Sequence, residues 1–364
     1  MKFLKRQTNK VFIVLGNQCN LNCKYCLQKP LIENQLYNII NNDIYDFLCE
    51  TAYENKNHTL DICFYGGEPT LYFNNIKEIV LELEKRNTVN FNYGIITNGK
   101  AITDDMIFFF NKYNFNVTIS WDGYNSLKTR GFDVFSDINK KNKILKLNNL
   151  CLSGVMSSYN YHLELLSAFN DIDKEYYKYH SYHLYVNIDD IFDTGLSNKE
   201  LLNIDYSRVN YEINALLKIL DLYVQDSNYY NSNDVLIIQY LNSIISKVTS
   251  NEQEKNRIIT RCGNGITVLN IDLKGNLYPC HNVSKPIGTI YDNLYNIYNN
   301  VLKLDNTLEF MKKCNNCSVL SICKGGCKLI NSDTRAKTYC KLKKSVYEPI
   351  LKYIERVNNY VNNI

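Results

Sequence analysis

The chain has 364 residues, of which 45% are hydrophobic and 21% are charged, and its formal net charge is +4. This is an ordinary globular balance, and the length fits two domains or one large domain with an extension. The positive charges are spread along the chain instead of forming a basic stripe, which argues against nucleic-acid binding.

The apolar run near the N-terminus, residues 11–15, is too short for a signal peptide. No stretch approaches the roughly 20 apolar residues that a membrane helix needs. We therefore expect a cytoplasmic protein with no membrane partner. In that reducing compartment the 13 cysteines are expected to be metal ligands or catalytic groups instead of disulfides.

Short β-branched apolar runs alternate with amphipathic stretches in the first half of the chain. The expected strands cover residues 11–15, 60–65, 91–97, 116–121, 150–156 and 182–188. Helices are expected between them, for example over 76–86 and 104–113. This alternation indicates βαβ units and a parallel sheet, and six units fit an open, partial (β/α)6 barrel of the TIM type within the α/β class.

The second half of the chain has a different pattern. Residues 190–258 are polar with helical periodicity, seven cysteines follow within 262–340, and the chain ends in an amphipathic stretch. We therefore expect four parts, which are a barrel over 1–215, a helical bridging region over 216–261, a cysteine-rich domain over 262–345 and a C-terminal helix over 346–364.

Three closely spaced cysteines, Cys19, Cys23 and Cys26, follow the first expected strand. A structural zinc site needs a fourth ligand, so an iron–sulfur cluster with one iron free of protein ligands suits this group better. Functional residues of such barrels lie at the carboxyl ends of the strands. The motifs GGEP (66–69), TNG (97–99) and SWDG (120–123) fall at the ends of the next three strands.

Together these motifs resemble the radical S-adenosylmethionine (SAM) superfamily, whose C-x3-C-x2-C signature has an aromatic residue before its last cysteine. The resemblance implies a [4Fe-4S] cluster whose open iron chelates SAM, and a 5′-deoxyadenosyl radical that abstracts a hydrogen atom from a C–H bond. It also implies that SAM is bound by Tyr25, Gly66, Gly67, Glu68, Pro69, Asn98, Ser120, Asp122 and Arg130.

In that set, Gly66, Gly67 and Glu68 would bind the methionine amino group, because glycine lets the backbone approach closely. Asn98, Ser120 and Asp122 would lie at the ribose and the methionine carboxylate, with Arg130 near the carboxylate.

The seven later cysteines resemble, at every spacing, the SPASM extension of radical SAM enzymes. This resemblance implies two auxiliary [4Fe-4S] clusters, three clusters in all. The outer cluster would be held by Cys314, Cys317, Cys323 and Cys340, and the inner one by Cys262, Cys280 and Cys327. The inner cluster has either an open iron or a fourth ligand that the sequence does not identify. The remaining cysteines, Cys49, Cys63 and Cys151, lie in apolar contexts and are expected to be core thiols.

Two subgroups share this layout. Maturases of ribosomally made peptides form thioether or carbon–carbon cross-links or epimerise residues, and residues 262–282 are similar to theirs. Anaerobic sulfatase maturases, which oxidise Cys or Ser to formylglycine, carry an aspartate as proton acceptor where this chain has His281. We therefore expect an oxidoreductase that abstracts a hydrogen atom from a residue of a ribosomally made peptide or protein and forms a thioether or carbon–carbon cross-link. His281 is the candidate base, and sulfatase maturation is the alternative.

The expected partners are a precursor peptide or protein substrate and a reductant such as flavodoxin or ferredoxin. Many peptide maturases carry a leader-binding domain before the barrel, whereas the first strand here begins near residue 11. We therefore expect the precursor peptide to be bound by the helical region or presented by a separate leader-binding protein. A hypothesis of another class, a zinc-binding interaction module without catalysis, stays open. The sequence gives neither the substrate, the bond formed nor the oligomeric state.

Overall fold

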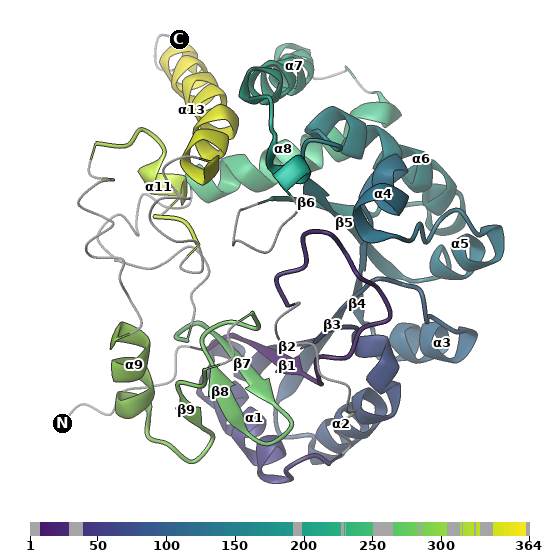
Figure 1. Ribbon diagram of the computed structural model, residues 1–364, viewed down its shortest axis with the longest axis vertical. Helices are drawn as coiled ribbons and strands as arrows, with labels where there is room; N and C mark the ends of the chain where they lie inside the picture. The colour runs from purple at the N-terminus through teal and green to yellow at the C-terminus, as the bar shows by residue number, and fades with distance from the viewer. Residues whose placement is uncertain are drawn as a thin grey trace.

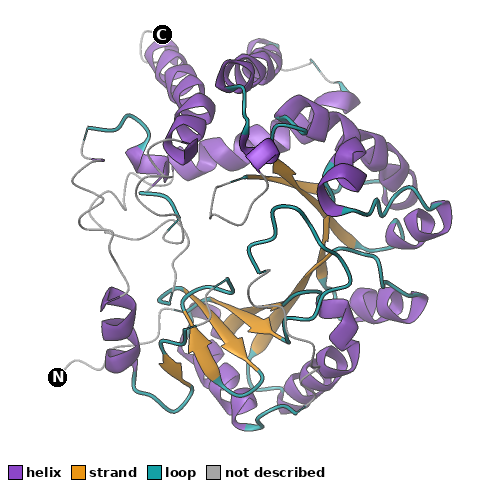
Figure 2. Ribbon diagram, viewed as in Figure 1, coloured by secondary structure: helices purple, strands orange, loops and turns teal. Residues whose placement is uncertain are grey.

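A curved, nine-stranded sheet forms the centre of the molecule, in the order β6-β5-β4-β3-β2-β1-β7-β8-β9. The computed structural model describes residues 8–28, 39–191, 199–226, 229, 231–249, 265–282, 285–303, 314, 316–323, 325–327 and 338–361. Its six barrel strands are β1 (Lys10–Val14), β2 (Thr59–Tyr65), β3 (Asn90–Thr97), β4 (Asn116–Ser120), β5 (Asn149–Met156) and β6 (Tyr185–Asp190). All are parallel, and with the helices outside them they make an open, partial α/β barrel (Figures 1 and 2).

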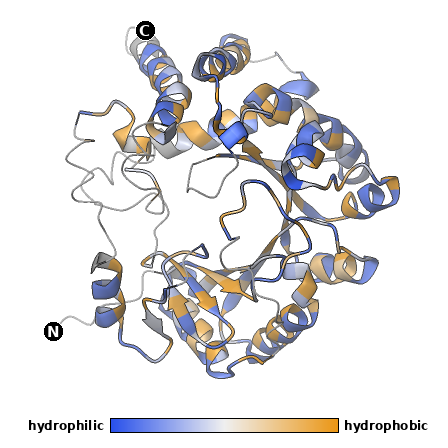
Figure 3. Ribbon diagram, viewed as in Figure 1, coloured by the Kyte–Doolittle hydropathy of each residue, from blue (hydrophilic) through white to orange (hydrophobic). Residues whose placement is uncertain are grey.

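The outer face of the sheet is covered by helices that alternate with the strands. They are α1 (Asp43–Glu54), α2 (Phe73–Arg86), α3 (Asp104–Lys112), α4 (Ser126–Arg130), α5 (Ile138–Ile144) and α6 (His162–His180), with short 3-10 turns η2 (Lys56–His58), η3 (Pro69–Tyr72) and η4 (Gly123–Asn125). Each long helix is amphipathic, as the blue and orange bands in Figure 3 show. In α2, for example, Ile76, Ile79 and Leu83 recur at helical spacing and are buried.

The sheet continues past the barrel with strands from the C-terminal part of the chain. Strand β7 (Val268–Asp272) pairs with β1 in parallel, with Ile13 beside Ile271. The strands β8 (Asn276–Tyr278) and β9 (Gly288–Thr289) follow antiparallel. The sequence did not predict β7, because its five residues are a short apolar run within the cysteine-rich segment. The pairing makes the start of that segment a direct extension of the barrel wall.

The remaining helices come from the part of the chain that follows β6. They are η5 (Lys199–Leu202), α7 (Tyr206–Gln225), η6 (Ser232–Asp234), α8 (Val235–Thr249), α9 (Leu294–Lys303), α11 (Leu320–Cys323) and α13 (Cys340–Val361). Helix α13 packs along α7 and begins six residues before the expected start at 346, so Cys340 lies in its first turn. Among the described residues, no helix combines the length and the apolar character that crossing a bilayer would require.

Candidate active site

A cavity of about 1020 Å³ lies on the inner side of the partial barrel. Its walls include strand residues that the pleat turns inward, most of them polar: Lys10, Phe12, Thr118, Ser120, Cys151, Ser153, Asn187 and Asp189. The centre of a closed (β/α)8 barrel is instead packed with branched apolar side chains. This barrel is therefore hollow, with walls that can hydrogen-bond a bound molecule.

The loop after β1 carries Cys19, Cys23 and Cys26 to this cavity. The loop is held by its own backbone, since Cys26 N–H donates to Cys23 O at 3.2 Å, and by α4, since Lys24 N–H donates to Thr129 O at 2.9 Å. Burial raises the pKa of the Cys23 thiol to about 11, against the opposing effect of a nearby guanidinium.

An iron–sulfur cluster and a zinc ion place different demands on three thiols. In a cubane each thiolate binds a different iron, whereas a structural zinc ion gathers all its ligands around one point. Within the described part of the chain, no group of three His, Cys, Asp or Glu side chains is gathered around one point. The three cysteines still lie close enough for their charges to act on one another. The assignment of Cys19, Cys23 and Cys26 as one cluster ligand set stays a prediction.

The glycine-rich segment after β2 braces this cysteine loop. Glu68 N–H donates to Gln18 O at 2.9 Å. A side-chain carbon on Gly67 would lie 2.4 Å from Gln18 O and 2.5 Å from Asn17 O, so only glycine permits this approach. The same applies to Gly66, where such a carbon would lie 2.3 Å from a backbone oxygen of the loop.

Glu68 is 1% exposed, and its carboxylate joins the end of β2 to the end of β3. Oε1 accepts hydrogen bonds from Thr70 N–H at 3.0 Å, Thr70 Oγ1 at 2.6 Å and Thr97 Oγ1 at 2.5 Å. Oε2 accepts from Asn98 N–H at 2.8 Å. Burial raises the pKa of Glu68, and these hydrogen bonds oppose the shift. Only Oε2 keeps capacity for a further donor, so the expected contact with the SAM amino group stays a prediction for that oxygen. The next residue, Pro69, begins η3.

Asn98 links the end of β3 to the cysteine loop. Its Nδ2 donates to Asn20 Oδ1 at 2.8 Å and lies 4.0 Å from Cys19 Sγ. Its Oδ1 accepts from Lys100 N–H at 2.8 Å. Asn98 and Ser120 both line the cavity, and their expected contacts with the cofactor stay predictions.

Asp122 is fully buried at the end of β4 and collects four groups. Its Oδ2 accepts from the Tyr25 hydroxyl at 2.5 Å and from Thr129 Oγ1 at 2.6 Å, and it lies 3.2 Å from Arg130 Nε. Its Oδ1 accepts from Val155 N–H at 2.9 Å. Burial acts to lower the pKa of Arg130, but the charges of Asp122, Tyr25 and Cys23 and the hydrogen bond to Asp122 together outweigh it, and the pKa is raised. Tyr25 and Arg130 line the cavity, whereas Asp122 holds them from behind.

His281 lines the same cavity, with its ring half-buried against two aromatic side chains. The centre of the His281 ring lies 4.1 Å from the ring centre of Tyr65 and 5.2 Å from the ring centre of Phe12. Burial lowers the pKa of His281 to about 4, so the imidazole is neutral at pH 7. Its backbone oxygen accepts from Gln28 Nε2 at 3.0 Å, which ties the segment after β8 to the first cysteine loop.

Two of the three cysteines expected to hold the inner auxiliary cluster, Cys280 and Cys327, line the cavity. The third, Cys262, lies outside the described residues. The four expected outer ligands are Cys314, Cys317, Cys323 and Cys340. Cys314 O accepts from Cys317 N–H at 2.9 Å, and the other two lie at the end of α11 and the start of α13.

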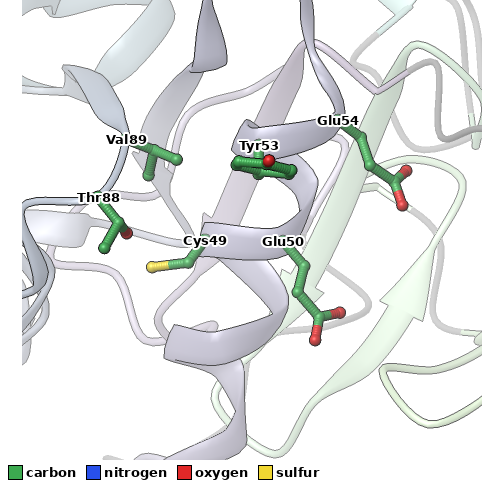
Figure 4. Close-up of a pocket in the computed structure, with 6 residues that line it drawn as sticks. All are labelled: Cys49, Glu50, Tyr53, Glu54, Thr88 and Val89. Carbon is green, nitrogen blue, oxygen red and sulfur yellow. The ribbon is translucent and has the colours of Figure 1, made fainter.

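The cysteines outside the two groups have different environments. Cys63 is 7% exposed and is a core thiol, as expected. Cys49 packs at the edge of the core, beside a shallow hollow lined by Glu50, Tyr53 and Val89 (Figure 4). The expectation is wrong for Cys151, which points into the central cavity from β5. Burial raises the pKa of the Cys151 thiol to about 11.

A partial barrel with three thiols after its first strand and braced polar groups after the next three is the arrangement of a radical SAM enzyme. Residues 13–147 match the family model described as the Radical SAM superfamily. The chain therefore contains a radical SAM domain and is an enzyme, which removes the hypothesis of a zinc-binding module without catalysis. The domain implies a [4Fe-4S] cluster and SAM as cofactors.

Two curated proteins are similar along most of the chain. A cysteine-type anaerobic sulfatase-maturating enzyme of Clostridium novyi is 27% identical over 363 residues, which cover 92% of this chain and 92% of that protein. The radical SAM cyclopropyl synthase TigE of Paramaledivibacter caminithermalis is 24% identical over 362 residues, which cover 88% of this chain and 68% of that protein.

Two solved structures have a similar fold. Native anSMEcpe with bound AdoMet matches with a TM-score of 0.67 at 18% identity, over 96% of this chain and 99% of that one. Streptococcus suis SuiB bound to its precursor peptide SuiA matches with a TM-score of 0.56 at 16% identity, over 90% and 73% of the two chains.

Proposed function

We propose that this radical SAM enzyme is a maturase that removes a hydrogen atom from a residue of a ribosomally made peptide or protein and forms a thioether or carbon–carbon cross-link. The observation that carries the proposal is the cavity of about 1020 Å³, which is lined both by the first cysteine loop and by Cys280 and Cys327 of the second group. When bound, the first cluster and SAM supply the radical that takes the hydrogen atom.

The size and the walls of the cavity suit a peptide segment. Small-molecule sites usually enclose about 300–1,000 Å³. This cavity is at the upper end of that range. Its apolar surface can receive peptide side chains, and its inward-facing hydroxyl and amide groups from β4, β5 and β6 offer partners for a peptide backbone. The solved structure of SuiB, which has a similar fold, contains a bound precursor peptide, and this supports a peptide or protein substrate.

The chain's own groups position the cofactors in this proposal. Cys19, Cys23 and Cys26 would hold the first cluster, and the later cysteines would hold two auxiliary [4Fe-4S] clusters. The buried Asp122 fixes the Tyr25 and Arg130 side chains at the cavity wall. Iron analysis of anaerobically reconstituted protein should give roughly twelve irons per chain for three cubanes, and about four would leave the first cluster alone.

The proposed partners are a precursor peptide, a flavodoxin or ferredoxin as reductant, and a separate leader-binding protein, in the cytoplasm. The four-part division of the chain, with boundaries at 215, 261 and 345, belongs to the same proposal.

The test is to incubate the reconstituted enzyme, SAM and a reductant with the short peptide encoded beside its gene. We expect the peptide to lose two hydrogens, and fragmentation to locate a cross-link. The variant Cys327→Ala should keep the first cluster but make no product. Formation of 5′-deoxyadenosine from SAM with no change in the peptide's mass would contradict cross-linking.

Sulfatase maturation is the second candidate, because the Clostridium novyi sulfatase-maturating enzyme is similar over 92% of both chains. The same assay separates the two functions. A sulfatase-derived peptide that becomes an aldehyde at its Cys or Ser, while the neighbouring peptide stays unchanged, would establish this alternative.

A further inference from the structure

A maturase that oxidises its substrate needs a group that accepts a proton. The substrate first loses one hydrogen atom to the cofactor. It then loses one electron and one proton, whether a double bond forms (R₂CH–XH to R₂C=X) or a thiol and a carbon join in a thioether. An oxidised iron–sulfur cluster can take the electron, and a side chain in the cavity must take the proton. This inference rests on the proposed function and identifies that side chain.

Three carboxylates are among the described residues that line the cavity: Glu68, Asp189 and Asp190. Glu68 is buried and already accepts four hydrogen bonds from its own chain. Asp190 forms an ion pair with the ammonium of Lys343, which is 1% exposed. The imidazole of His281 is packed against the rings of Tyr65 and Phe12, which restricts its approach to a substrate.

Asp189 differs from the other two carboxylates. It is an exposed residue of β6 that faces the cavity. Its Oδ2 accepts a hydrogen bond from Asn187 Nδ2 at 3.0 Å, and the same amide donates to Ser153 Oγ at 3.1 Å. One neighbour therefore orients the carboxylate and leaves its other oxygen open to the cavity.

The register of the sheet places Asp189 beside the cofactor side of the site. Asp189 is the partner of Val155 on β5, and Val155 N–H donates to Asp122 Oδ1 at 2.9 Å. Adjacent strands are about 5 Å apart. Asp189 on β6 is thus two strand spacings, about 10 Å, from Asp122 at the end of β4, the group that holds Tyr25 and Arg130 in the cavity wall.

The charge of Asp189 reaches other walls of the cavity. Burial is the main cause of the raised pKa values of Tyr65 on β2 and Cys151 on β5, and the negative charge of Asp189 adds to both shifts. The same charge also acts on Tyr240 of α8 and Lys343 of α13, so the place of Asp189 at the cavity is given by the cavity lining itself.

We propose that Asp189 is the catalytic base that accepts the substrate proton, with Asn187 as its positioning residue. Asp189 lies on β6, which is an edge strand of the sheet.

The test compares Asp189→Asn with a matched control, Asp61→Asn. Asp61 is also an exposed strand aspartate bonded to one asparagine amide, Asn92 Nδ2 at 2.9 Å, but it does not line the cavity. With the peptide that the wild-type enzyme modifies, Asp189→Asn should still form 5′-deoxyadenosine. The ratio of modified peptide to 5′-deoxyadenosine should fall by about 100-fold or more, with no change for Asp61→Asn.

An unchanged ratio in Asp189→Asn would overturn the assignment, and a loss in His281→Gln alone would transfer the role to His281. A second readout needs no substrate and no turnover. It is the pH dependence of Cys151 alkylation by iodoacetamide, followed by peptide mapping. Removal of the Asp189 charge should move this profile to lower pH, and Asp61→Asn should not.

The two readouts separate this inference from the proposed function. A wild-type enzyme that modifies no peptide contradicts the proposed function, whereas the Cys151 profile still decides where the Asp189 carboxylate points. An unshifted profile in Asp189→Asn would show that the carboxylate does not face the cavity beside Cys151, and the assignment would then fail.

Discussion

The ion pair between Lys343 and Asp190 joins helix α13 to the end of β6, and its removal should destabilise the fold strongly. Lys343 is 1% exposed, and the side chain of Asp190 is 11% exposed. The Lys343 ammonium also lies 5.3 Å from the ring centres of Tyr339 and Tyr347. Asp190→Asn would leave this ammonium buried without its counter-charge.

Breaking one side of a buried ion pair costs about 3–5 kcal/mol, because an uncompensated charge stays in the interior. The control is Asp104→Asn, which removes the pair between Lys143 Nζ and Asp104 Oδ2 at 2.7 Å. Those side chains are 37% and 68% exposed, so the loss should be about 1 kcal/mol or less. Lys343→Met, which removes the buried charge and keeps most of the volume, should cost less than Asp190→Asn.

The loss of unfolding free energy in Asp190→Asn should depend on pH. Burial lowers the pKa of Lys343 from its ordinary value of 10.5 to about 7, against the opposing charge of Asp189. Because the folded pKa lies below the unfolded one, the unfolded state binds more protons between about pH 7 and 10.5, and stability from this group rises with pH across that window. Without Asp190 the pKa falls further, so Asp190→Asn should lose less stability at pH 9 than at pH 6.

The assay is urea unfolding under anaerobic conditions, followed by far-ultraviolet circular dichroism at both pH values. Equal losses of unfolding free energy in Asp190→Asn and Asp104→Asn would show that the Lys343–Asp190 pair is not desolvated. A loss in Asp190→Asn that is the same at pH 6 and pH 9 would show that Lys343 does not titrate in this range.

Three further changes test the first site. Cys23→Ala should abolish SAM cleavage and remove about four irons per chain, and continued formation of 5′-deoxyadenosine would contradict its role. Gly67→Ala places a carbon 2.4 Å from Gln18 O, so it should displace the cysteine loop and lower iron incorporation, which metal analysis measures. Glu68→Gln presents an amide group to donors in a buried site and should cost about 1–3 kcal/mol in thermal unfolding. It should also weaken SAM binding in calorimetry, and an unchanged dissociation constant would count against that contact.

The barrel was predictable because its strands are apolar runs bounded by helices. The run 150–156 corresponds to β5 (Asn149–Met156), and 116–121 corresponds to β4 (Asn116–Ser120). Strand β7 was missed because its pairing with β1 depends on a contact between residues about 260 positions apart, which periodicity does not report. The start of α13 was placed too late because residues 341–344 are mostly lysines and mask the apolar stripe.

The sequence motifs contain residues that line one cavity, but the hydrogen bonds between these residues were not predictable from the motifs. Glu68 and Asp122 are held by hydroxyls of Thr70, Thr97 and Thr129, and of these only Thr97 belongs to a motif, TNG (97–99). The position of Cys151 did have a signal. It is out of phase with the buried Leu150 and Leu152 of the same strand, and period-two alternation places such a residue on the other face of the sheet.

The same alternation explains how the last residues of β6 serve two parts of the molecule. Asp189 bonds within the cavity wall, whereas its neighbour Asp190 pairs with Lys343 on the helix that begins at Cys340. The two roles are separable by experiment. Asp190→Asn should lose stability and keep the Cys151 alkylation profile, whereas Asp189→Asn should shift that profile and keep most of its stability, because Asp189 is exposed. If both variants lost both properties together, the end of β6 would act as one structural unit, and neither carboxylate would have a separate role.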